Sequence, residues 1–190
     1  MAHRSPALDH AMKIVTWAGS WIALAAVAAV AATLAIRRRI KPLVVAAILV
    51  GWLGELVAVT VAKSVVQRHR PPEAVRLVIT HGWSFPSGHS ANAVVVFVAA
   101  AALVTGLTSA RTLHALAWVL AVLFAALVGF SRVELGAHWT TDVLAGAAWA
   151  GCWVVVVVAV LRPHRYAPAP LRAPNRTPVD QTPRGRTREE

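Results

Sequence analysis

Ionisable side chains interrupt this largely apolar sequence at a few places, and their types suit the binding and transfer of a phosphoryl group. Three of them are cations that can neutralise a doubly negative phosphate, and an arginine can hold two of its oxygens at once. Two are histidines, which exchange protons near neutral pH. One is a carboxylate that lies four residues after a histidine. These residues are Lys63, Arg70, Arg132, His89, His138 and Asp142.

The histidines and the carboxylate could divide the chemistry between them. Residues four apart share one face of a helix, so Asp142 can accept the Nδ1 proton of His138 and leave Nε2 as a nucleophile. His89 comes from another segment and can serve as the general acid for a leaving oxygen. Cysteines, histidines and carboxylates do not cluster with the spacing of metal ligands, so we expect neither a metal nor another cofactor.

A short polar motif, Ser87 and Gly88, directly precedes an apolar segment that begins at His89. The free N–H groups and the dipole of a helix N-terminus favour an anion, and glycine lets the backbone approach it closely. We therefore expect a phosphate-binding site that combines this helix start with the three cations. Its members are Lys63, Arg70, Ser87, Gly88 and Arg132.

Five apolar segments must position these residues. Hydrophobic side chains make up 57% of the 190 residues and charged ones only 14%, against about 25% charged in soluble domains. Each segment approaches the length of about 20 residues that crosses a bilayer, and backbone in lipid must form helices to satisfy its own hydrogen bonds. The expected spans are Ile14–Ile36, Leu43–Val66, His89–Leu107, Leu113–Phe130 and Trp139–Leu161. This pattern predicts an all-α integral membrane protein and excludes a soluble enzyme, a disordered chain and a disulfide scaffold.

The composition divides the chain into three parts. Residues 1–13 form a short extracytoplasmic or interfacial segment, residues 14–161 form the transmembrane domain, and residues 162–190 form a basic, proline-rich tail that we expect to be disordered. The basic loop Arg37–Lys41 marks the cytoplasmic side of the cell membrane, together with the tail. The site therefore faces the extracytoplasmic side. The net charge of +11 lies in loops and tail rather than on one face, so nucleic acid is not an expected partner.

In chain order, the polar residues form three motifs: Lys63-x6-Arg70-Pro71, Pro86-Ser87-Gly88-His89 and Ser131-Arg132-x5-His138-x3-Asp142. All eleven fixed positions resemble the signature of the type 2 phosphatidic-acid phosphatase superfamily, over about residues 14–161. The resemblance implies a helical-bundle phosphatase that acts on lipid phosphates through a phosphohistidine without a metal. It also implies that His138 is the nucleophile, Asp142 its partner and His89 the acid and base. Soluble vanadium haloperoxidases share these motifs, but five spans argue against that activity.

The number of spans departs from the pattern of this family. Membrane members usually have six spans, and the first motif ends the third of them. Here the first motif ends the second span, and Thr16–Ser20 resembles the start of the family's second span. Residues 1–13 are too short to cross a bilayer, so a counterpart of the first family span is missing from the expected arrangement.

The sequence therefore predicts a membrane lipid phosphatase whose partners are a lipid phosphate and the bilayer. A polyprenyl phosphate or pyrophosphate is the first choice of substrate, followed by phosphatidylglycerophosphate and phosphatidic acid. Two alternatives stay open: a lipid phosphotransferase with the same site, and a non-catalytic membrane scaffold or transporter with a retained phosphate pocket. Glu55, in the middle of a span, is expected to be a neutral packing residue or a partner for a site cation. The sequence leaves the oligomeric state undetermined.

Overall fold

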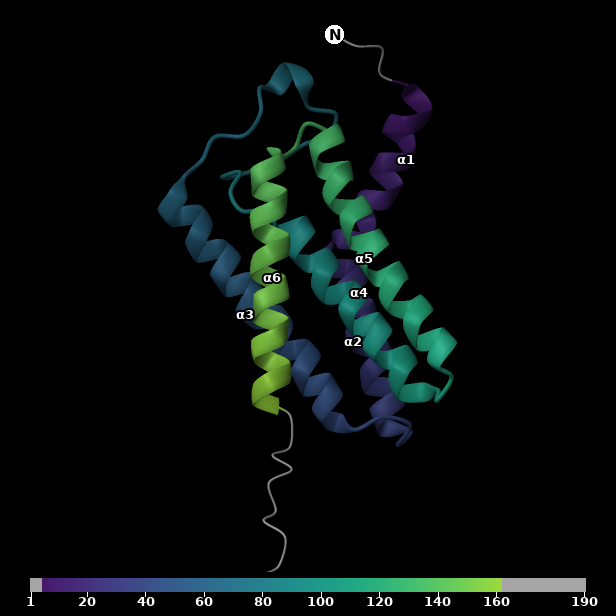
Figure 1. Cartoon of the computed structure of the whole chain (residues 1–190). Coiled ribbons are helices and arrows are strands. Elements are labelled where there is room, and N and C mark those ends of the chain that lie inside the picture. The colour runs from purple at the N-terminus through teal and green to yellow at the C-terminus, as the bar shows by residue number, and fades with distance from the viewer. Residues whose placement is uncertain (1–4, 162–190) are drawn as a thin grey trace, which may run out of the picture.

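The computed structural model describes residues 5–161, and the regular structure of these residues is entirely helical (Figure 1). Four helices are long and apolar enough to cross a membrane, with 20 to 25 residues each, or roughly 30–37 Å. They are α3 (Pro42–Val66), α4 (Gly88–Leu107), α5 (Arg111–Glu134) and α6 (Thr140–Leu161). The predicted all-α membrane bundle is thus confirmed. The predicted tail, residues 162–190, lies outside the described residues.

Helix α4 occupies the centre of the bundle, where it packs against α3, α5, α6, the N-terminal helix α2 (Trp21–Ile36) and the 3₁₀ turn before it (Trp17–Gly19). Its core-facing side chains are small or β-branched, and Ala91, Val95, Val96 and Ala99 are all buried. Small side chains let helix backbones approach closely in a membrane, where packing rather than the hydrophobic effect holds helices together. The sequence of α4 therefore suits a helix surrounded by others.

The predicted first span, Ile14–Ile36, is wrong as a single helix. The structure has α1 (Pro6–Thr16), a 3₁₀ turn over Trp17–Gly19 and α2 (Trp21–Ile36), with a 47° bend between the two parts. A Cβ atom at Gly19 would lie 2.6 Å from the carbonyl oxygen of His89, so glycine permits this close approach of the turn to α4. Ser20 then starts α2 as its N-cap, accepting a hydrogen bond from the N–H of Ala23.

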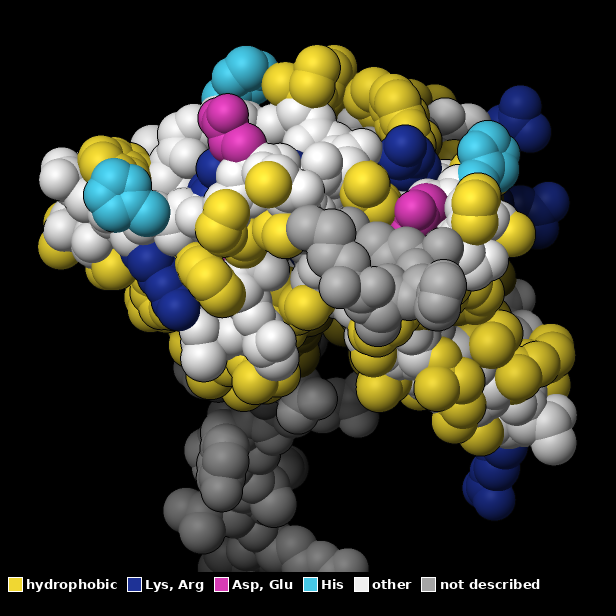
Figure 2. Space-filling model, turned by 90° about the horizontal axis from the view of Figure 1, so that it is seen from above, with side chains coloured by type: hydrophobic (Ala, Val, Ile, Leu, Met, Phe, Trp, Pro, Cys, Tyr) yellow, Lys and Arg dark blue, Asp and Glu magenta, His cyan; other side chains and the backbone are white. Residues whose placement is uncertain are grey.

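The alternating directions of the helices bring the polar motifs to one end of the bundle. The end of α3, the start of α4, the end of α5 and the start of α6 all lie in the upper half of Figure 1, below the long loop between α3 and α4. Viewed from above, this end carries histidine, basic and acidic side chains among apolar ones (Figure 2). Helix α5 continues one turn beyond the predicted Phe130, so Arg132 lies in its last turn.

Glu55 lies in the buried face of α3, with its side chain 1% exposed and its Oε2 atom without a hydrogen-bond partner. No ion pair within residues 5–161 involves Glu55, so it does not neutralise a cation of the site. An unpaired carboxylate ion at this depth would be very unfavourable, so we expect a neutral side chain that packs between helices.

The variant Glu55→Gln tests this expectation, because glutamine is neutral and has the same shape. We expect the midpoint of heat-induced aggregation in detergent to change by no more than about 2 °C, and phosphate release to stay within about twofold of wild type, since neutral same-shape changes cost little. A loss of activity of tenfold or more in folded protein would mean that the charge of Glu55 takes part in function.

Candidate active site

His138 and Asp142 meet at the start of α6, although not on one helix as the sequence analysis expected. His138 lies before the helix, which begins at Thr140. Asp142 instead accepts a hydrogen bond from the N–H of Trp139 through Oδ2 at 3.0 Å, the return half of a capping box. The same carboxylate oxygen lies 3.5 Å from His138 Nδ1. Both side chains are buried, so this geometry orients the imidazole in a site shielded from bulk water.

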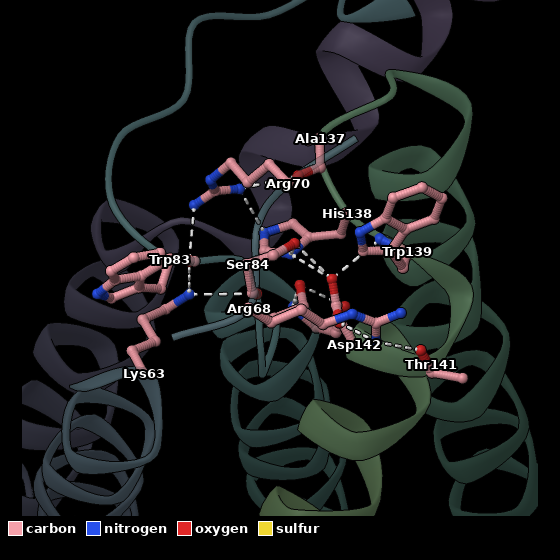
Figure 3. Close-up of polar contacts among 12 residues, drawn as sticks. Lys63, Arg68, Arg70, Trp83, Ser84, Ala137, His138, Trp139, Thr141 and Asp142 are labelled. Carbon is pink, nitrogen blue, oxygen red and sulfur yellow. Dashed lines mark hydrogen bonds and ion pairs between the residues drawn. The ribbon is translucent and has the colours of Figure 1, made fainter. Parts of the chain in front are cut away.

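The Nδ1 atom of His138 faces two oxygens, Asp142 Oδ2 and Ser84 Oγ, each at 3.5 Å. The opposite ring nitrogen, Nε2, lies 3.2 Å from the Nη1 atom of Arg70 (Figure 3). Because a guanidinium can only donate, Nε2 must be the unprotonated nitrogen and Nδ1 the protonated one. This tautomer leaves a lone pair on Nε2, as a histidine nucleophile requires.

The charge state of His138 supports the same conclusion. Burial lowers the pKa of His138 far below its ordinary value, and the positive charges of Arg70, Arg132 and Lys63 lower it further. The imidazole is therefore neutral at neutral pH. His89 lowers this pKa as well, so all four groups are close enough to act on the charge of the His138 ring.

Lys63, in the last turn of α3, and Arg70, in the loop between α3 and α4, are both held by backbone oxygens of that loop. The Nζ atom of Lys63 donates to the backbone oxygens of Trp83 and Ser84, at 2.6 and 3.3 Å. Arg70 donates to the backbone oxygens of Gly82, Ala137, His81 and Trp83, at 2.8 to 3.2 Å. Carbonyl groups position a cation without cancelling its charge, so the loop backbone holds both side chains in the site as cations (Figure 3).

Arg132 is a buried cation without an acidic partner. It is 6% exposed, donates from Nη1 to Thr16 Oγ1 at 2.9 Å, and has a buried Nε that lacks a hydrogen-bond partner. No carboxylate among residues 5–161 forms an ion pair with it. An unpaired buried charge is unfavourable, and a bound anion would remove this cost. The arrangement therefore suits an arginine that binds an anionic ligand.

The N-terminus of α4 is built around Ser87. Its Oγ accepts hydrogen bonds from the N–H and the hydroxyl of Ser90, and its own N–H donates to the carbonyl of Asp142 at 2.9 Å. Ser87 is thus the N-cap of α4 and ties it to α6, a role that the sequence analysis did not assign. The N–H groups of Gly88 and His89 belong to the first turn of α4, where backbone donors have no acceptor within the helix.

The structure adds three contacts that the sequence analysis missed. Arg68 forms an ion pair with Asp142 at 2.8 Å and also donates to Thr141. Ser84 donates its hydroxyl proton to Asp142 Oδ2. Arg68 and Ser84 belong to none of the three motifs, and no local pattern distinguishes them, because both act on a residue more than fifty positions away.

The connection that carries His138 is held by the long loop above it. The N–H of Leu77 donates to the carbonyl of Leu135 at 3.0 Å, and the next residue, Gly136, has a φ of +65°. A Cβ atom at Gly136 would clash with the carbonyl oxygen of Val75. Glycine is therefore required for both the backbone conformation and the contact.

The described residues thus form a helical membrane bundle with cations, histidines and a buried carboxylate gathered at one end. The family model of the PAP2 superfamily matches residues 43–166. The chain therefore belongs to the PAP2 superfamily, an assignment that confirms the resemblance seen in the motifs.

Two curated relatives share part of this region. Phosphatidylglycerophosphatase B from Bacillus subtilis (strain 168) is 45% identical over 87 residues, which are 45% of this chain and 42% of that protein. An undecaprenyl-diphosphatase from Sulfolobus acidocaldarius is 41% identical over 73 residues, which are 38% of this chain and 30% of that protein. The matches thus span less than half of each relative.

Two crystal structures share the fold. The transmembrane PAP2-type phosphatidylglycerolphosphate phosphatase from Bacillus subtilis superimposes with a TM-score of 0.75 at 31% identity, over 83% of this chain and 78% of that one. LpxE from Aquifex aeolicus superimposes with a TM-score of 0.62 at 24% identity, over 82% of this chain and 88% of that one. With the four apolar helices, these likenesses establish an integral membrane protein of the PAP2 fold.

Proposed function

We propose that this protein is a membrane lipid phosphatase that hydrolyses a phosphate monoester or pyrophosphate on a lipid. The observation that carries this proposal is the set of cations around a buried, neutral histidine, above all Arg132, which is itself buried and has no acidic partner among the described residues. Such a set suits a multiply charged anion beside a nucleophile. The printed names of the relatives, a phosphatidylglycerophosphatase and an undecaprenyl-diphosphatase, point to lipid phosphates as the class of substrate.

In the first step, His138 Nε2 attacks phosphorus in line with the bond to the leaving oxygen. The N–P bond forms as the P–O bond breaks, and His89 gives its proton to the departing oxygen of the lipid or of the lipid phosphate. Asp142 stabilises the positive charge that develops on the imidazole. Lys63, Arg70 and Arg132, with the first N–H groups of α4, stabilise the negative charge on the three equatorial oxygens.

In the second step, water attacks the phosphohistidine from the side that the leaving group vacated. His89, now neutral, takes a proton from the water as the O–P bond forms and the N–P bond breaks. Inorganic phosphate leaves, and His138 and His89 return to their starting protonation states. His89 acts twice, as acid and then as base.

No step passes through a metal, because histidines and cations supply all the groups that the reaction needs. Among residues 5–161, no three His, Cys, Asp or Glu side chains are grouped as metal ligands.

The distribution of charge indicates how the chain is oriented in the membrane. The basic loop between α2 and α3 lies at the end of the bundle opposite the site. Under the positive-inside rule the site then faces the extracytoplasmic side of the cell membrane.

Phosphate release by purified protein in detergent tests the proposal. The assay compares a polyprenyl pyrophosphate, a polyprenyl phosphate, phosphatidylglycerophosphate and phosphatidic acid, each with a chelator present. We expect release with at least one of them, the polyprenyl substrates first. Folded protein that releases no phosphate from any of the four would contradict the proposal, and release that stops with chelator would contradict the metal-free mechanism.

Replacing the proposed acid, His89→Ala, should slow the reaction according to the leaving group. General acid catalysis contributes about 10²–10⁴-fold, and it matters most for a poor leaving group such as the alkoxide of a lipid. We expect a loss in this range for a lipid monophosphate and a much smaller loss for p-nitrophenyl phosphate, whose leaving oxygen needs no proton. Equal losses for both substrates would exclude His89 as the acid.

A further inference from the structure

We propose that the bend between α1 and α2 is a working part of the site and that Thr16 is a positioning residue for Arg132. Thr16 lies at the end of α1, whereas Arg132 lies in the last turn of α5, 116 positions away in the chain. The residues that match the family model begin at 43, so this segment lies outside the matched region. The proposal rests on the proposed function, because it assigns the role of Arg132 to phosphate binding.

The contact between the two side chains is direct and sheltered. Thr16 Oγ1 accepts a hydrogen bond from Arg132 Nη1 at 2.9 Å, and the two residues are 9% and 6% exposed. Among the described residues, Thr16 is the one side chain that bonds this guanidinium. A guanidinium is planar, so fixing one terminal nitrogen fixes the plane of the other donors. Thr16 therefore sets the direction of the Nε that has no partner.

A second contact ties the same segment to α4. Gly19, three residues after Thr16, lies so close to α4 that an added Cβ would be 2.6 Å from the carbonyl oxygen of His89 and 2.7 Å from Val128 Cγ1. Both helix ends that supply His89 and Arg132 are thus in contact with one turn of chain. The 47° bend between α1 and α2 lies at this same turn.

The positioning role of Thr16 follows from the absence of an acidic partner for Arg132 among the described residues. Arg132 has no acidic partner to hold it in place, and an unrestrained arginine would lose side-chain entropy when it bound phosphate. Thr16 restrains it before the ligand arrives, with an uncharged acceptor that leaves the positive charge intact. This is the preorganisation on which electrostatic stabilisation of a transition state depends.

The variant Thr16→Val tests the proposal, because valine keeps the shape of threonine and removes the acceptor. Inorganic phosphate is the probe, titrated by calorimetry into folded protein, and phosphate release from the best lipid substrate gives kcat and KM. Because a hydrogen bond to a charged group is lost, we expect phosphate affinity and kcat to fall about tenfold or more. Thr16→Ser restores the hydroxyl and should restore both values.

Thr33→Val is the matched control. The hydroxyl of Thr33 donates to the carbonyl of Ala29 on α2, at 2.9 Å and in an exposed position. The same chemical change is thus made on the neighbouring helix, away from the site. We expect phosphate affinity and kcat to match wild type.

A double-mutant cycle shows whether Thr16 acts through Arg132. In an Arg132→Gln background, Thr16→Val should have no further effect on phosphate affinity, because the guanidinium that it positions is gone. Both backgrounds carry the same packing change, so the comparison holds even if Thr16→Val lowers the yield of folded protein. An equal loss in both backgrounds would overturn the proposal, as would wild-type affinity in Thr16→Val. Wild-type protein that neither binds phosphate nor releases it would instead overturn the proposed function itself.

Discussion

The variant His138→Ala is expected to lose essentially all phosphate release, by at least about 10⁴-fold, since removing a catalytic nucleophile commonly costs this much or more. The reason lies in the geometry of the ring: Nδ1 faces Asp142 and Ser84, so Nε2 alone is available to phosphorus. Alanine leaves the cations in place, so the variant should still bind inorganic phosphate. Phosphate release from lipid substrates measures the first effect, and calorimetry measures the second.

A covalent intermediate makes this prediction more specific. Substrate labelled with ³²P and quenched during turnover should leave an acid-labile label on wild-type protein and none on His138→Ala. His114→Ala is the matched control, because His114 lies at the other end of α5, where its ring bonds the backbone oxygen of Thr108. Residual activity of a few per cent in His138→Ala, or label that persists in it, would show that another group attacks phosphorus.

The variant Asp142→Asn is expected to fold and to lose about 10³–10⁴-fold in kcat, the size of effect that follows when a histidine loses its carboxylate partner. Asp142 is fully buried and accepts hydrogen bonds from Ser84, Trp139 and Arg68 as well as facing His138 Nδ1. An amide offers one acceptor and one donor, so the Nδ1 proton loses its acceptor and the imidazolium loses a stabilising charge.

The variant Arg68→Gln tests whether Asp142 acts through His138 or through its ion pair with Arg68. Arg68 pairs with Asp142 from a partly exposed position, with 38% of its side chain exposed, and partly exposed ion pairs contribute little. We expect Arg68→Gln to retain activity within about tenfold, because Asp142 keeps its charge and its contact with His138. If Asp142→Asn retained wild-type kcat, or if Arg68→Gln lost as much as Asp142→Asn, the carboxylate would not act through the histidine.

Local sequence determined the long helices. The four predicted spans after residue 42 agree with α3, α4, α5 and α6 to within a few residues at each end. They could be predicted because hydropathy and the length of a bilayer-spanning helix are properties of a continuous segment, and Pro42 at a helix start is a local signal too.

The order of the polar motifs also indicated which helix ends must meet. Lys63, His89 and Arg132 lie at the ends of apolar segments, and consecutive spans alternate in direction. That alternation places the end of one span on the same side of the membrane as the start of the next. A single site that contains these residues could therefore be predicted without knowledge of how the helices pack. The motifs likewise gave the family, which the match over residues 43–166 confirms.

Tertiary structure alone decided how these groups are held. The bond from Arg132 to Thr16 and the contacts of Asp142 with Arg68 and Ser84 join positions 58 to 116 apart in the chain, and the bend at Gly19 depends on a neighbouring helix. No periodicity or spacing encodes such contacts, because each exists only where two segments approach. Apolarity along the chain fixed where helices form; the packing around α4 fixed where each charge points.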